Sequence, residues 1–175
     1  MSEFKKTTLI LDKKFDAMQK RHYLNGVTTV LHCHHYAALY SQLAIDAGET
    51  KLLSDVAEET FYNLLNNYFE LYDLYEMEDR ITIAEQYYAA LGLGCMKVNF
   101  AGEDSGEVEL DISHIDAGWK RKWGVYSKPV NYISAGYIAG MFAAIFGKPI
   151  HSFNTLEVQS IVKGDKTSIF KVHHN

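Results

Sequence analysis

Residues 130–149, VNYISAGYIAGMFAAIFGKP, constrain the fold more than any other part of the chain. The stretch is strongly apolar, and its small side chains recur at helical spacing: Ala135, Gly136, Ala139, Gly140, Ala143 and Ala144. A glycine inside a helix costs about 1 kcal/mol relative to alanine, so close packing is the natural reason to keep two of them there. The sequence therefore predicts a helix lying tightly against a sheet or another helix, closed by Gly147-Lys148-Pro149.

Three more helices are expected before it. Residues 27–47 have apolar side chains at helical spacing and end at Gly48, a good C-cap. A second helix runs from Thr50 to about Glu76, with an apolar face wide enough to need two neighbours or another subunit. Its acidic residues Asp55, Glu58 and Glu59 are expected on a solvated face. The third helix is ITIAEQYYAALGLG, residues 81–94.

The remaining segments alternate apolar and polar residues, as strands do. TTLILD (7–12) is expected as a short strand, followed by a turn at Asn25-Gly26. MKVNF and EVELDI flank GEDSG as one hairpin, and IHSFNTLEVQSIV and TSIFKV flank GDK as another. The order helices, hairpin, helix, hairpin predicts an α+β fold, in which long helices pack on an antiparallel sheet in a single ligand-binding domain, residues 1–175.

Composition narrows the classes of function. A net charge of −5, with Lys120–Lys122 as the one basic cluster, argues against a nucleic-acid partner. No run approaches the roughly 20 apolar residues that cross a membrane, and the charged N-terminus does not resemble a secretory signal. Cys33 and Cys95 lie far apart in apolar surroundings, which favours reduced core thiols in a cytoplasmic protein. The 12 tyrosines and 9 phenylalanines must line a core, a dimer interface or a pocket.

The last 40 residues carry a family resemblance. GYIAGMFAAIFGKPIHSFNTLEVQSIVKGDKTSIFKV resembles the end of the 4-vinyl reductase-like domains, also called hydrocarbon-binding domains. The matching residues are Gly136, Gly140, Phe146, Gly147, Pro149, Glu157, Gly164, Asp165 and Phe170. The resemblance implies an α+β domain, usually a homodimer, with a pocket for a small hydrophobic or aromatic molecule. Many members have zinc-binding cysteines where this chain has Ser160 and Ser168, and serine is a poor zinc ligand. The family's zinc site is therefore not expected here.

Histidines suggest a site of another kind. His32, Cys33, His34 and His35 stand together in LHCHHYAALY, and residues three or four apart share one face of a helix. His114 and Asp116, in SHIDAGW, would project together if that segment is a strand. His32, His35, His114 and Glu157 could then bind one divalent metal, zinc or iron, but structural histidines and an Asp116 helix cap explain the same residues.

Two functions follow from these residues. The first is a small-molecule-binding domain whose pocket has a polar end lined by histidines and takes its ligand contacts from His34, Tyr40, Trp119, Trp123 and Tyr137. The alternative is a metal-dependent enzyme acting on a small organic substrate, with His114, Asp116 and Tyr36 as catalytic residues.

Overall fold

The computed structural model describes residues 7–31 and 33–175. Over these residues the chain begins with three strands and three helices: β1 (Lys13–Asp16), β2 (Arg21–Leu24), β3 (Val27–Thr29), α1 (His34–Ala47), α2 (Thr50–Leu71) and α3 (Met77–Ala90). It continues with β4 (Gly94–Ala101), β5 (Ser105–Ser113), α4 (His114–Trp123), α5 (Tyr132–Ile145), β6 (Phe153–Gln159), the 3-10 turn η1 (Ile161–Lys163) and β7 (Ser168–His174). The predicted α+β class is confirmed, although the order of elements differs in detail.

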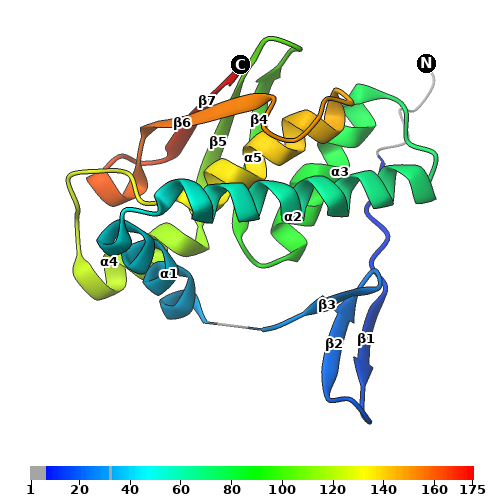
Figure 1. Ribbon diagram of the computed structural model, residues 1–175, viewed down its shortest axis with the longest axis horizontal. Coiled ribbons are helices and arrows are strands. Elements are labelled where there is room, and N and C mark those ends of the chain that lie inside the picture. Colours follow the sequence, from blue (N-terminus) through cyan, green and yellow to red (C-terminus); the bar gives the residue numbers. More distant parts are fainter. Residues whose placement is uncertain (1–6, 32) are drawn as a thin grey trace.

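The main sheet has four antiparallel strands in the order β4-β5-β7-β6. Both predicted hairpins, β4-β5 and β6-β7, are present, and the β5-β7 pairing joins them into one sheet. α5 lies between this sheet and α2 (Figure 1), and ten of its 14 residues are buried. A helix that is apolar on every side requires partners on every side. The sheet and α2 supply them.

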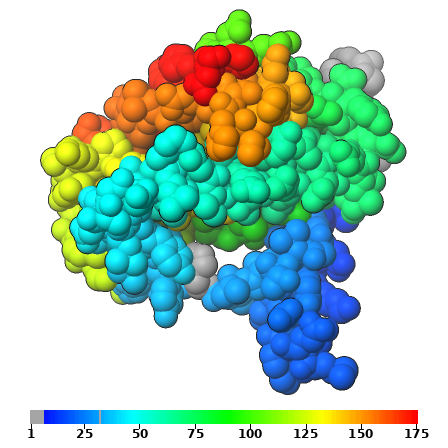
Figure 2. Space-filling model, viewed as in Figure 1, coloured from blue at the N-terminus to red at the C-terminus, as the bar shows by residue number. Residues whose placement is uncertain are grey.

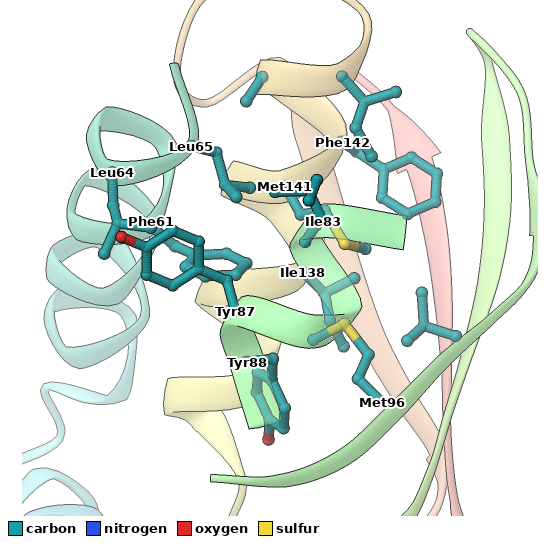
Figure 3. Packing of buried hydrophobic residues seen from close by; sticks show 14 of the residues in the cluster. Phe61, Leu64, Leu65, Ile83, Tyr87, Tyr88, Met96, Ile138, Met141 and Phe142 are labelled. Atoms are coloured by element: carbon teal, nitrogen blue, oxygen red, sulfur yellow. The ribbon is translucent and has the colours of Figure 1, made fainter. Parts of the chain in front are cut away.

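The core forms where α2, α3, α5 and the sheet meet (Figure 3). Phe61 and Leu65 come from α2, and Ile138, Met141 and Phe142 come from α5. Fully buried side chains from α3 and the sheet complete it: Ile83, Tyr88, Val108, Leu110, Phe170 and Val172. The long helices therefore pack as expected, and much of the aromatic content lies in the core.

The two glycines of α5 let its backbone approach that of α2 closely. A Cβ at Gly136 would overlap the carbonyl oxygen of Ser54, and one at Gly140 would overlap the carbonyl oxygen of Glu58. Because the obstacle is backbone in both cases, no side-chain rearrangement could make room. The spacing predicted close packing, and the partner of α5 is helix α2.

The N-terminal part departs from the sequence prediction. β1, β2 and β3 form a separate antiparallel sheet that projects from the body (Figure 1). The predicted turn is correct: Asn25 and Gly26 have φ of 48° and 79°, as a two-residue hairpin turn requires. Residues 27–29 pair with β2, however, so the helix expected from residue 27 begins only at His34. Residues 7–12 are not a strand, and Ile10 N–H donates to Tyr68 Oη at 2.8 Å.

Smaller corrections concern helix ends, α4 and the cysteines. α2 ends at Leu71 rather than near Glu76. The segment after Ser113 is a helix, not a strand, because the Ser113 side chain accepts the backbone N–H of Asp116 and caps its first turn. Cys33 and Cys95 are exposed rather than buried in the core. Within the described ranges, no helix is both long and apolar enough to cross a membrane.

Candidate functional site

A cavity of about 590 Å³ lies between the small N-terminal sheet and the body of the molecule. Figure 2 shows the surface hollowed where the blue β1–β3 segment meets the rest of the chain. Its apolar walls include Phe15, Tyr23, Leu24, Val30, Leu31, Leu91 and Leu93. Polar groups are contributed by Lys13, Lys14, His22, Thr29 and His114. The mixture of apolar walls with a few polar groups is typical of small-molecule sites.

The structure brings part of the two histidine segments together. His114, the first residue of α4, lines the cavity, and its ring lies edge-on to that of His34, with centroids 5.9 Å apart. The His35 ring lies beside the His34 ring, tilted by 38°, with centroids 4.3 Å apart. α1 and α4 pack closely here, since a Cβ on Gly118 would overlap the His34 carbonyl. His32 lies outside the described residues, so the four-residue metal set that includes it stays a prediction.

Asp116 does not project with His114. Two residues apart on a helix, the side chains lie on nearly opposite sides of the first turn. Asp116 is fully buried, and its Oδ2 accepts a hydrogen bond from Asn131 Nδ2 at 2.9 Å. The same amide also donates to Ser113 Oγ at 3.0 Å. Burial raises the pKa of the Asp116 carboxyl. The hydrogen bond from Asn131 acts in the opposite direction but is the smaller effect.

Glu157 is the second acid of this buried polar cluster. Its Oε1 accepts a hydrogen bond from Ser168 Oγ at 2.9 Å, while Ser168 Oγ accepts the backbone N–H of Ile161 at 3.0 Å. Burial, with a smaller contribution from the nearby Asp116 charge, raises the pKa of Glu157 to about 7. Ser160, where the resembling domains carry a cysteine, is also fully buried. The two serines that stand where many of the resembling domains have zinc-binding cysteines are thus both buried, and Ser168 bonds directly to Glu157.

Several buried polar atoms around α4 have no hydrogen-bond partner among the described residues: His34 Nε2, Asp116 Oδ1, Trp119 Nε1 and Ser160 Oγ. Buried polar atoms are normally paired, and an ordered water or ligand group is a common partner where the protein supplies none.

The aromatic residues predicted to bind a ligand, and Tyr36, which was predicted to be catalytic, do not lie together. Trp119 is buried against Val130 and Val162. The Trp123 ring lies beside it, tilted by 49° with centroids 4.7 Å apart, and is 38% exposed. Tyr137 stacks on Phe61 in the core at 4.9 Å. Tyr36 and Tyr40 lie exposed on α1. None of these residues lines the 590 Å³ cavity, whose aromatic walls are instead Phe15 and Tyr23.

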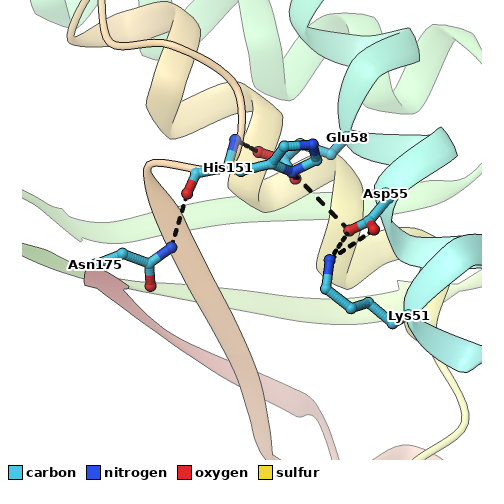
Figure 4. A network of polar contacts seen from close by, with 5 residues as sticks. All are labelled: Lys51, Asp55, Glu58, His151 and Asn175. Carbon is cyan, nitrogen blue, oxygen red and sulfur yellow. Dashed lines mark hydrogen bonds and ion pairs between the residues drawn. The ribbon is translucent and has the colours of Figure 1, made fainter.

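A third cluster was missed by the sequence prediction. Asp55 and Glu58 of α2 meet His151, which lies between α5 and β6 (Figure 4). Among the residues that the structure describes, this is the one group of three potential ligand atoms from His, Cys, Asp or Glu within 4.8 Å of one another. Glu58 was expected on a solvated face but is only 4% exposed. The Asp-x-x-Glu spacing on one helix face is visible in the sequence, whereas the approach of His151, 93 residues from Glu58, is not.

Comparisons with known proteins identify the fold. No family model matches the sequence, and no curated protein matches it. The phenol-responsive sensory domain of the transcription activator PoxR, solved with phenol, superposes with a TM-score of 0.78 and 12% identity, over 93% of this chain and 84% of that one.

Two further structures share the fold. A vinyl-4-reductase family protein from Methanocaldococcus jannaschii has a TM-score of 0.57 and 16% identity, over 84% of each chain. A trafficking protein particle complex subunit 3 from Naegleria fowleri, covalently bound to palmitic acid, has a TM-score of 0.53 and 13% identity, over 81% of this chain and 95% of that one. The sequence of the C-terminal third resembles 4-vinyl reductase-like domains, and the fold is similar to that of a vinyl-4-reductase family protein over 84% of the chain.

Proposed function

We propose that this chain is a 4-vinyl reductase-like domain that binds a small aromatic molecule in the cavity between the β1–β3 sheet and the body. The observation that carries the proposal is the cavity itself, with apolar walls from four short segments of the chain and His114 among its lining residues. Its volume of about 590 Å³ falls within the roughly 300–1,000 Å³ of small-molecule pockets. The likeness of fold to a phenol-responsive sensory domain supports an aromatic ligand.

The chemistry of the walls favours a flat ligand with one polar group. The rings of Phe15 and Tyr23 can stack on an aromatic face, and aromatic pairs gain about 0.5–1.5 kcal/mol beyond their buried area. His114 and His22 can donate or accept a hydrogen bond at a hydroxyl. The neighbouring His34 ring restricts the orientations open to His114.

Phenol is the probe that tests the site. Titration of the protein with phenol is expected to give saturable binding by calorimetry, and cyclohexanol, which has the hydroxyl without the aromatic ring, is expected to bind more weakly. His114→Ala should weaken phenol binding about 3- to 10-fold, because one hydrogen bond contributes about 0.5–1.5 kcal/mol. His173→Ala, on the exposed end of β7, serves as the matched control and should leave the affinity unchanged.

Two outcomes would contradict this assignment. One is the absence of saturable binding of phenol to a folded protein. The other is binding that His114→Ala leaves intact and Trp119→Phe weakens, since Trp119 Nε1 lies buried on α4 away from the cavity lining. The second result would move the ligand into the core beside the buried acids.

We also propose that the domain is a homodimer that uses the exposed apolar face of α1. Tyr36, Tyr40 and Leu43 follow one another at helical spacing and are 48–55% exposed. Leu52 and Val56 on α2 add to the exposed apolar surface. An apolar face of this kind is a common sign of a protein–protein interface.

The double substitution Tyr40→Glu with Leu43→Glu is expected to shift the protein from dimer to monomer, because two charges would be placed in the apolar contact. Light scattering after size-exclusion chromatography measures the mass directly. Leu71→Glu, which changes an exposed leucine at the far end of α2, is the matched control. A wild-type protein that is monomeric at tens of micromolar would refute the proposal.

A further inference from the structure

Asp55, Glu58 and His151 are arranged like part of a coordination shell. His151 Nδ1 lies 2.9 Å from Glu58 Oε2 and 4.0 Å from Asp55 Oδ1 (Figure 4). A metal bound at about 2.0–2.2 Å to nitrogen and oxygen ligands holds those ligand atoms roughly 3–4 Å apart. The three atoms therefore need only a slight separation to share one cation.

The charges at this place also favour a cation. The Glu58 side chain is 5% exposed, and a buried carboxylate is costly unless a positive charge compensates it. Asp55 adds a second carboxylate next to it. Lys51 Nζ binds both oxygens of Asp55, at 2.7 and 2.6 Å, but its side chain is 81% exposed and free to swing into solvent. A divalent ion would neutralise both acids at once.

The three ligands are held by well-fixed backbone. Gly136 and Gly140 bring α5 against α2 at Ser54 and Glu58, which fixes the helix that carries both acids. Glu58 Oε1 accepts the backbone N–H of His151 at 2.6 Å, and Asn175 Nδ2 donates to the His151 carbonyl at 2.7 Å. Ligands that are already positioned lose little entropy when they bind an ion.

The fourth side of the cluster is open. A cavity of about 420 Å³ adjoins the three side chains and is lined further by polar residues that include Thr50, Ser54, Tyr132, Asn154 and Thr155. Three protein ligands with an open position describe a site that keeps water or a small oxygen-bearing ligand on the metal. We propose that Asp55, Glu58 and His151 bind one divalent transition-metal cation, with Zn²⁺ as the ion to test. The inference is independent of the aromatic-ligand cavity.

Zinc alone is a sufficient probe. The full chain, stripped with a chelator and freed of any tag, is titrated with Zn²⁺ by calorimetry, and bound metal is counted by mass spectrometry after gel filtration. One equivalent is expected. Its affinity should fall more than about 100-fold in His151→Asn and in Glu58→Gln, since even outer-shell changes cost about 10–100-fold. Asp55→Asn should weaken binding in the same direction.

The substitutions are chosen to keep the fold. His151 has a φ of 67°, a left-handed conformation that asparagine tolerates. Glutamine at position 58 can still accept the backbone N–H of His151. Circular dichroism with a chelator present checks that each variant is folded, and a Tm that rises with zinc in the wild type but not in these variants is the second readout.

Other histidines provide the matched control. His34→Ala with His35→Ala, and separately His173→Ala with His174→Ala, should leave the zinc equivalent in place. The proposal is overturned by an absence of saturable uptake, by uptake that survives both His151→Asn and Glu58→Gln, or by uptake lost only in the other histidine variants. A Tm that falls equally with and without zinc in the site variants would assign the cluster to a structural ion pair instead.

Discussion

Gly140→Ala is expected to lower the free energy of unfolding by about 2 kcal/mol. The added Cβ would overlap the carbonyl oxygen of Glu58 and crowd the backbone N of Tyr62, so α5 must move away from α2. Overpacking of a core costs about 1–3 kcal/mol, and a backbone obstacle places this site at the upper end. The gain of about 1 kcal/mol in helix propensity offsets part of that cost. Urea denaturation followed by circular dichroism measures the difference.

Gly102→Ala is the matched control. A Cβ there would meet the edge of the Phe100 ring at 3.3 Å, and the backbone needs no left-handed conformation. Its effect should stay within about 0.5 kcal/mol. If Gly140→Ala were neutral or stabilising while Gly102→Ala behaved as expected, the close contact between α5 and α2 would be wrong. The metal site proposed on Glu58 would then lose its fixed backbone.

Glu157→Gln is expected to stabilise the protein at pH 8 and to have little effect at pH 5. Burial raises the pKa of Glu157 from 4.5 to about 7, so the folded state keeps a proton that the unfolded chain releases. The stability that the protonated Glu157 gives the wild type is fully present below about pH 4.5 and is lost as pH rises through 7. Glutamine stays neutral, so the variant does not suffer this loss. With 1.36 kcal/mol for each of the 2.5 pKa units, this loss of wild-type stability between low and high pH is at most about 3.4 kcal/mol, and partial exposure of Glu157 reduces it.

The measurement is the difference in unfolding free energy between Glu157→Gln and wild type, at pH 5 and at pH 8. This difference isolates position 157 from the other acids, which give the wild type its own pH dependence. Glu109→Gln, on strand β5 and separated from β6 by β7, is the control substitution. A variant that is equally destabilised at both pH values would mean that Glu157 acts through its hydrogen bond to Ser168 and not through a raised pKa.

The local sequence pattern was enough to predict much of the fold. The alternation of β4 to β7, the Asn25-Gly26 turn and the glycine spacing of α5 all depend on residues close in sequence, and the structure agrees with each. The prediction failed at two places where an adjacent segment decides between helix and strand. Residues 27–29 have a helical pattern but pair with β2, and His114 begins a helix because Ser113 caps it.

For the candidate sites, too, the sequence indicated some residues and the tertiary structure decided where they lie. The sequence singled out His34, His114, Asp116 and Glu157 by residue type, by spacing and, for Glu157, by the family resemblance. Only the tertiary structure separates them, with His114 at the cavity and Asp116 among buried hydroxyls on the other side of α4.

The cavity and the Asp55–Glu58–His151 cluster form only when the helices and strands pack together. Each depends on segments far apart in the chain, and no local spacing records which of them meet. The sequence determined which elements form, because short-range sterics and periodicity govern helices and turns. The tertiary structure decided which side chains share a site, because that depends on how those elements bury their apolar faces against one another.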